Sequence, residues 1–246
     1  MALKIDKAYV IKVMDYQTFD QIITFFNEFG YKFNLISIGS RRIASKNGRH
    51  LIIGNLNEVE YFPARIENKI GRMKKSVTIT AIPWEFHDYL SFNLLNEFVY
   101  KETNPNKKLF NFYSNFINVM HEHKFSDYAL LIRVLIFIIE FSGMSLSRIR
   151  CAFCLSNQPI FIDKNNFSWI CELCYEKNAN NLKVFSNKIV LITKDLIKHK
   201  RTDIKVNKIE AIEIISFLNE SIYSAIGIWF ETLKHFVKPN KIQITG

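Results

Sequence analysis

Apolar and polar residues alternate in short runs through the first 82 residues of the chain, as in strands with one buried face. Four of five apolar runs show this two-residue period, and the fifth, Ile22–Phe26, is compact and mostly apolar. Glycines between Gly30 and Gly71 separate the runs. Five short strands in about 80 residues match the size of an OB fold, so the pattern predicts a small closed or nearly closed antiparallel barrel. The alternating runs contain Tyr9, Ile11 and Val13; Tyr31, Phe33 and Leu35; Val59 and Tyr61; and Val77, Ile79 and Ala81.

From Trp84 the spacing of apolar residues changes to the three- and four-residue steps of amphipathic helices. One helix is predicted over residues 86–98 and a second over residues 109–120. A third predicted helix, Phe125–Phe141, is apolar on nearly all sides and should be the buried central helix. Gly143 is well placed to end it.

Helical patterning returns near the C-terminus. Asn207 followed by Glu210 matches a capping box, and apolar residues at three-residue steps continue from Ile209 to Leu218. A last helical segment is predicted over residues 217–237, passing through Gly227.

The positive charge of the chain is concentrated in two regions. Lys and Arg number 33 against 23 Asp and Glu, which gives a formal net charge of +10. Residues 1–80 carry a net charge of +6 and residues 179–246 carry +5, whereas the middle of the chain is close to neutral. A basic excess within a strand-patterned segment favours a polyanionic partner. The C-terminal excess is explained equally well by an ordinary solvated surface.

The sequence predicts neither a signal peptide nor a membrane span. Residues 1–10 mix charged and apolar positions. The longest apolar run, Ala129–Ile139, is interrupted by Arg133 and is too short to cross a bilayer. We therefore expect a cytoplasmic protein with no membrane partner.

All four cysteines lie within 24 residues as two Cys-x2-Cys pairs, Cys151 with Cys154 and Cys171 with Cys174. Each pair places two thiolates on one tight turn, and four thiolates complete the tetrahedral coordination of one Zn²⁺. Because four protein thiolates leave no open position, such an ion is predicted to be structural. A disulfide pair, which a cytosolic setting disfavours, and a metal-free remnant of a zinc site are the alternatives. The apolar residues between the pairs predict a small hairpin, including Phe167 and Trp169.

No motif in the sequence predicts catalysis. A zinc deaminase needs His-x-Glu upstream of Pro-Cys-x-x-Cys, and neither occurs. The sequence also lacks a Walker loop, a Gly-x-Ser-x-Gly elbow and a Gly-x-Gly-x-x-Gly turn. His121-Glu122-His123 is interpreted as a solvated helix end, because its two rings point to different faces. We expect that the protein is not an enzyme.

A basic loop separates two of the predicted strands. Residues 39–50 read Gly-Ser-Arg-Arg-Ile-Ala-Ser-Lys-Asn-Gly-Arg-His, with four full positive charges and no acid. Their backbone N–H groups, hydroxyls and guanidiniums can all donate to phosphate oxygens. In a barrel of this kind the strand face and its loops form the usual groove for single strands. A merely solvated loop is the alternative. The predicted nucleic-acid-binding residues are Arg41, Arg42, Lys46 and Arg49 of the loop, extended by Lys12, Arg72, Lys74 and Lys75.

Segments spread along the chain match, in order, the pattern of one known family. They are residues 8–16 (Ala-Tyr-Val-Ile-Lys-Val-Met-Asp-Tyr), the Ile22–Gly30 run, residues 39–46 of the basic loop, residues 141–146 (Phe-Ser-Gly-Met-Ser-Leu) before the first cysteine, and Gly227 followed by Leu233-Lys234. In these segments the chain resembles the RecO family of DNA repair and recombination mediators.

The resemblance implies an α+β protein: an N-terminal OB-fold β-barrel, then an α-helical domain with an inserted four-cysteine zinc module. With the residue patterns, it divides the chain into the barrel at residues 1–82, the helical domain at 83–150 and 178–246, and the zinc-finger module at 151–177.

The resemblance also implies a function. Such a protein binds single- and double-stranded DNA and anneals complementary strands. With RecR it loads RecA onto strands coated by single-strand-binding protein (SSB), and it would be associated with the nucleoid. The resemblance further implies that Arg133 contacts the acidic C-terminal tail of SSB. The alternative is a structural arginine whose charged end reaches the surface or pairs with a buried acid such as Glu140.

Two other functions fit the residues alone. An RNA-binding or ribosome-associated zinc-ribbon protein would share the positive charge and the four-thiolate site. A protein-interaction adaptor would use the same basic residues to bind acidic peptide tails.

Overall fold

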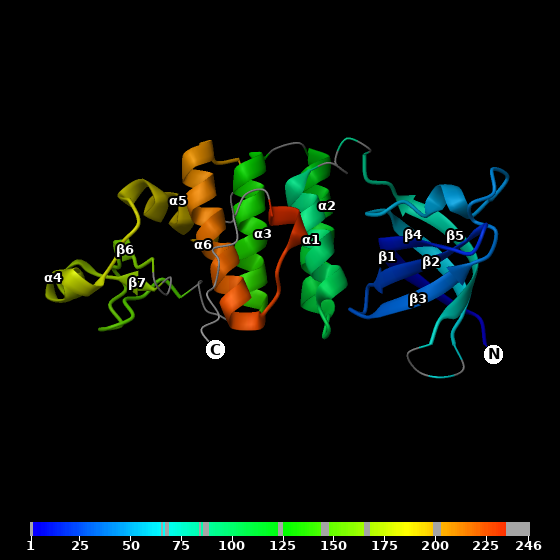
Figure 1. Cartoon of the computed structure of the whole chain (residues 1–246), viewed down its shortest axis with the longest axis horizontal. Coiled ribbons are helices and arrows are strands. Elements are labelled where there is room, and N and C mark those ends of the chain that lie inside the picture. Colours follow the sequence, from blue (N-terminus) through cyan, green and yellow to red (C-terminus); the bar gives the residue numbers. More distant parts are fainter. Residues whose placement is uncertain are drawn as a thin grey trace, which may run out of the picture. The chain divides into compact units, whose positions relative to one another are not determined.

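The structure, a computed structural model, describes residues 2–64, 66, 69–83, 85, 89–122, 125–143, 148–164, 168–198 and 203–234. The chain divides into two compact units, residues 1–123 and 124–246. In the described residues, the first unit holds a five-stranded barrel and two helices, and the second holds four helices and a two-stranded sheet (Figure 1). The architecture is α+β, as predicted.

The five strands of the first unit close into a barrel in the order β1-β2-β3-β5-β4 (Figure 1). Neighbouring strands are antiparallel except β3 and β5, which pair in parallel through Leu35 with Gly71 and Ile36 with Arg72. This closed, OB-like barrel confirms the prediction from the two-residue period. The strands are β1 (Lys4–Tyr16), β2 (Asp20–Asn27), β3 (Lys32–Ser37), β4 (Leu56–Phe62) and β5 (Gly71–Thr80).

A bulge in β1 connects the barrel to the first helix. The register of β1 against β2 shifts between Val10 and Lys12, so Ile11 is an extra residue in the ladder. Its carbonyl oxygen instead accepts a hydrogen bond of 2.8 Å from the Nδ2 of Asn96, on α1 (Leu90–Lys101). The bulge thus bends the strand and gives the helix a polar attachment.

The barrel core contains the predicted residues Leu35, Val59 and Tyr61 of β3 and β4. It departs from the predicted alternation in β1, where Ala8 and Val10 enter the core, and in β5. Met73 is buried, but further along the same strand Ser76 is buried while Val77 and Ile79 are 37% and 49% exposed. The register of β5 against β4 shifts at Lys74, and one extra residue moves the inward-facing set from odd to even positions. The alternation therefore predicts the strand but not which of its faces is buried.

The second helix, α2 (Lys107–Glu122), covers the outer face of β1. The ring of Tyr9 lies 4.8 Å from the ring of Tyr113, and its hydroxyl donates to the Oγ of Ser114 at 3.1 Å. Because helices bury this outer face, β1 is apolar on both sides near its middle. The predicted second helix is confirmed. The first begins at Leu90 as α1, and Trp84 and Phe86 lie outside the described residues.

Gly30, in the turn between β2 and β3, lies too close to the start of α2 to accept a side chain. Its φ is +89°, and a Cβ there would lie 2.2 Å from the carbonyl carbon of Asn106 and 2.4 Å from the nitrogen of Lys107. Both are backbone atoms, so α2 itself would have to shift. We expect Gly30→Ala to lower the free energy of unfolding by at least about 2 kcal/mol, measured by chemical denaturation.

Gly227→Ala is the matched control for this prediction. Gly227 also has a positive φ, +68°, but no described atom lies within 4 Å of a Cβ placed there. This control therefore tests backbone strain without the steric clash. An equal loss of stability in the two variants would show that the close approach to α2 has no energetic consequence.

In the second unit, α3 (Asp127–Phe141) is the central helix, as its nearly uniform apolar sequence predicts. Every residue from Ala129 to Ile139 is buried, and α3 packs against α5 (Asn187–Lys198) and α6 (Lys208–Ile226). Gly143 follows the helix with a φ of +88°, as expected at a helix end. Helix α5 is not among the predicted elements. No helix in the described part of the chain has the length and apolarity that a membrane span requires.

Helix α6 begins at the predicted capping box and ends earlier than predicted. The side chain of Asn207 accepts from the N–H of Glu210 at 2.9 Å, and the Glu210 carboxylate accepts from the N–H of Asn207 at 3.2 Å. Gly227 adopts the left-handed conformation and closes α6, so the predicted helix through Gly227 is wrong. A short 3-10 turn, η4 (Glu231–Leu233), follows, and residues 235–246 lie outside the described part.

A small cysteine-containing module lies between α3 and α5 in the sequence. It contains the strands β6 (Phe161–Ile162) and β7 (Trp169–Ile170), followed by α4 (Glu172–Asn178) and η3 (Ala179–Asn181). The predicted hairpin is confirmed, although Phe167 lies outside the described residues. An ion pair of 2.5 Å between Lys164 and Glu213 joins the module to α6.

Candidate nucleic-acid interface and metal centre

The four cysteine thiols form one cluster. Their Sγ atoms all lie within 4.8 Å of one another, and those of Cys154 and Cys171 are 3.6 Å apart. Cys151 and Cys154 lie on the turn before β6, whereas Cys171 is the N-cap of α4 and Cys174 lies in its first turn. Residues that are far apart in the sequence are therefore brought together by the short β6–β7 hairpin.

The turn at the first cysteine pair is fixed by backbone hydrogen bonds. The N–H of Leu155 donates to the carbonyl of Cys151 at 2.9 Å, and Leu155 has a left-handed φ of +61°. The N–H of Ala152 donates to the carbonyl of Trp169 at 2.8 Å, which joins the turn to β7. Burial raises the pKa of the Cys151 thiol, but hydrogen bonds from three backbone N–H groups outweigh it and lower the pKa to about 6. The turn thus favours the thiolate, the form that binds metal.

The cluster has the dimensions of a tetrahedral metal site. Four sulfurs at about 2.3 Å from one ion would lie about 3.8 Å from each other, close to the spacing of the Cys sulfurs. A set of four soft thiolate donors suits zinc or iron. The four cysteines could therefore hold a metal ion, with no coordination position left for a substrate.

The basic loop connects β3 to β4 and is attached at its start to the β1–β2 turn. The N–H of Gly39 donates to the Oδ1 of Asp20 at 2.7 Å, and the N–H of Arg41 donates to the carbonyl of Phe19 at 3.0 Å. The guanidinium of Arg42 lies over the ring of Phe19, 5.0 Å from its centroid. The loop and the β1–β2 turn therefore form one continuous surface.

The end of the loop, including η1 (Gly48–His50), is attached to β5. The side chain of Asn47 donates to the carbonyl of Lys74 at 3.3 Å and accepts from the N–H of Ser76 at 3.1 Å. The absence of a side chain at Gly48 lets this part of the loop pack against Ser40, since a Cβ there would lie 2.2 Å from the Ser40 carbonyl oxygen. These contacts bring the loop cations beside those of β5.

The structure divides the eight predicted nucleic-acid-binding residues into two groups of four. In the first group, no carboxylate elsewhere in the described chain forms an ion pair with the side chain, and each residue is exposed. In the second group, three side chains form ion pairs with carboxylates and the fourth donates to a tyrosine hydroxyl. The unpaired group is Arg42, Lys46, Arg49 and Arg72, and the partnered group is Lys12, Arg41, Lys74 and Lys75.

The partners of the second group are specific. Arg41 forms an ion pair with Asp15 at 3.2 Å. Glu60 forms ion pairs with two lysines, Lys74 at 3.1 Å and Lys75 at 3.9 Å. Lys12 instead donates to the hydroxyl of Tyr100, on α1, at 2.8 Å. A cation that already has a partner releases fewer counterions when it meets a phosphate.

Two exposed aromatic residues beside the loop are not among the predicted site residues. Tyr16 at the end of β1 is 40% exposed and Phe19 in the following turn is 46% exposed. Exposed aromatic rings beside cations are the usual partners of unstacked bases. In the sequence, Phe19 stands between two polar residues in a turn. This position alone does not predict whether its ring is exposed or buried.

Arg133 is buried within α3, with 9% of its surface exposed. Burial lowers the pKa of its guanidinium, and the charge of Glu140 opposes this effect. The effect of Glu140 on Arg133 supports the alternative to SSB binding, in which Arg133 pairs with this acid. His121 is exposed at the end of α2, whereas His123 lies outside the described residues.

Comparisons with curated proteins find relatives named DNA repair protein RecO. The chain is 26% identical to that of Mycoplasma mycoides subsp. mycoides over 219 residues, which cover 84% of this chain and 86% of the relative. It is 25% identical to that of Mycoplasma capricolum subsp. capricolum over 195 residues (75% and 78%) and 22% identical to that of Mesoplasma florum over 178 residues (69% and 66%). No family model matches the chain.

Proposed function

The chain belongs to the RecO family, and from this assignment we propose that it is a mediator of DNA repair and homologous recombination. In this proposal it binds single- and double-stranded DNA and anneals complementary strands. With RecR it helps to load RecA onto SSB-coated single strands. The protein acts by binding rather than by catalysis, in the cytoplasm and associated with the nucleoid.

The observation that carries the proposal is the basic surface of the barrel. Arg42, Lys46, Arg49 and Arg72 are exposed and free of acidic partners in the described chain, and the exposed ring of Phe19 lies beside Arg42. Cations can neutralise the backbone of a strand while an aromatic ring stacks on a base. Both features suit single strands of any sequence, which annealing requires.

The four thiols are proposed to hold one structural Zn²⁺. When bound, the ion would crosslink the first cysteine turn, β7 and the start of α4. The described core around it is small, centred on Cys151, Ile170 and Cys171. A core of this size needs a crosslink to remain folded. In this proposal the module of residues 151–177 is a folded insertion in the helical domain, and residues 1–82 form the barrel domain.

An annealing assay tests the proposed function. Two complementary labelled oligonucleotides should form a duplex faster with the protein than without it. In a competition at fixed salt, unlabelled single-stranded DNA should displace the labelled strand at lower concentration than a structured RNA does. Preference for the RNA, without acceleration of annealing, would instead support an RNA-binding zinc-ribbon protein.

Arg133 gives a test of partner binding. If its guanidinium contacts a carboxylate of the SSB tail, Arg133→Ala should cost about 1.5–3 kcal/mol of binding to a tail peptide, measured by calorimetry. Glu140→Gln keeps the cation and removes the acidic charge that acts on it, so this variant should not weaken peptide binding. Unchanged peptide affinity in a folded Arg133→Ala variant would leave Arg133 with only a structural role.

A further inference from the structure

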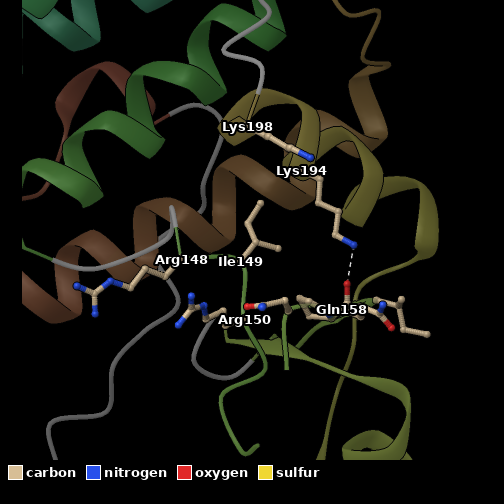
Figure 2. A pocket seen from close by; sticks show the side chains of 9 residues that line it. Arg148, Ile149, Arg150, Gln158, Lys194 and Lys198 are labelled. Atoms are coloured by element: carbon tan, nitrogen blue, oxygen red, sulfur yellow. Dashed lines mark hydrogen bonds between the residues drawn. The ribbon is translucent and has the colours of Figure 1, made fainter. Parts of the chain in front are cut away.

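A basic cavity of about 830 Å³ lies in the second unit, between the segments that flank the first cysteine pair and helix α5. Four cations line it: Arg148 and Arg150 from the segment before Cys151, and Lys194 and Lys198 from α5. Figure 2 shows the two lysines extending from α5 and the two arginines on the facing segment, with Ile149 between the pairs.

The cavity is unusual in its charge. No carboxylate is among the residues that line it. Within the described chain, Arg148, Arg150 and Lys198 form no ion pair, and all three are exposed. Like charges gathered around one cavity repel each other, so an anion bound there would be stabilised by all of them.

Lys194 has a different role from the other three cations. Its ammonium donates to the carbonyl of Pro159 at 2.5 Å, the dashed line in Figure 2. The same ammonium lies 5.7 Å from the centroid of the Trp169 ring. Burial and the nearby charge of Lys198 lower its pKa. Lys194 therefore attaches the cysteine module to α5, and Arg148, Arg150 and Lys198 are left to bind a ligand.

We propose that this cavity binds phosphate groups of a nucleic-acid backbone, as a second contact separate from the basic surface of the barrel. The inference rests on the proposed DNA-binding function. The side chains of Asn157 and Gln158 also line the cavity. Their amide N–H groups can add donors to phosphate oxygens. A nucleic-acid strand carries one phosphate at every nucleotide, so it can supply a separate anion to each of Arg148, Arg150 and Lys198, which line the cavity.

The test compares two variants that each lose three positive charges from the second unit. The cavity variant is Arg148→Gln, Arg150→Gln and Lys198→Gln. The control variant is Lys177→Gln, Lys183→Gln and Lys208→Gln, at exposed positions that do not line the cavity. Affinity for a mixed-sequence single strand is measured from low to moderate salt. The cavity variant should lose about 2 from the magnitude of the log–log salt slope, at about 0.7 per phosphate contact, and the control should lose little.

The outcomes separate this inference from the proposed function. If the unmodified protein binds DNA and the two variants have equal slopes, the cavity proposal is wrong while the barrel surface remains. If the unmodified protein binds no DNA, the proposed function fails. An aspartate-rich peptide that binds the unmodified protein but not the cavity variant, with an unchanged DNA slope, would assign the cavity to acidic peptides and overturn the proposal. If the cavity variant is less thermally stable than the unmodified protein, the single variant Lys198→Gln is used instead. Its salt slope should be smaller in magnitude by about 0.7.

Discussion

Replacement of Cys151 by Ser is expected to unfold the cysteine module. With one structural Zn²⁺, the binding free energy is about 10–16 kcal/mol in small zinc modules, as large as the whole stability of a typical domain. Cys151 is fully buried at the centre of a small core, so the loss of one thiolate removes both a ligand and packing. Chelation of the metal should have the same effect on the module. The barrel, in the other unit, should keep its fold.

Metal analysis and hydrogen exchange together measure this effect. The unmodified protein should contain about one zinc per chain, and amides of β7 and α4 should lose protection when Cys151 is replaced. Phe153→Ala is the control, because Phe153 lies between the first two ligands but is 56% exposed. Protein purified without chelator that contains no metal, yet keeps these amides protected, would rule out the zinc proposal.

The second large effect is expected from the basic surface of the barrel. The eight predicted residues allow two variants that each remove four positive charges from the same barrel. Replacing Arg42, Lys46, Arg49 and Arg72 by Gln should reduce the salt slope of single-strand binding by about 3, since each free cation meeting a phosphate contributes about 0.7. Replacing Lys12, Arg41, Lys74 and Lys75 by Gln should reduce it by clearly less.

The reason for the difference is local electrostatics. Asp15 and Glu60 already neutralise part of the second group, and Lys12 is held by Tyr100. Because phosphate contacts carry no base information, both variants should weaken binding to all sequences alike. Circular dichroism checks that each variant is folded. Equal slope changes in the two variants, or a larger change in the partnered group, would contradict this division of the surface.

Features that depend on local spacing could be predicted from the sequence. The two Cys-x2-Cys pairs predict the thiol cluster because each pair needs only one turn, and the hairpin between them brings the turns together. The capping box at Asn207 depends on two residues three positions apart. The two-residue period of β3 and β4 reflects one buried face, whereas β1 is bulged at Ile11 and buried on both faces. In β5 the bulge at Lys74 breaks this relation, so its buried face could not be predicted.

Features that depend on distant partners could not be predicted. Arg41 has no acidic neighbour in the sequence, and its partner Asp15 is brought beside it only by the attachment of the loop to the β1–β2 turn. The outward position of Phe19 depends on the same attachment. The basic cavity likewise needs α5 beside the segment before Cys151, and charge counts along the chain do not show this juxtaposition.

The most direct test of the account is a titration of the intact protein with a mixed-sequence single-stranded oligonucleotide at several salt concentrations. The account predicts binding at low salt, with log affinity falling linearly against log salt. The slope should be negative, with a magnitude of at least about 3 for the four unpaired barrel cations. It should be nearly the same for unrelated base sequences. Absence of binding at low salt would contradict the account, and the basic residues would then be better explained as a surface for acidic peptide tails.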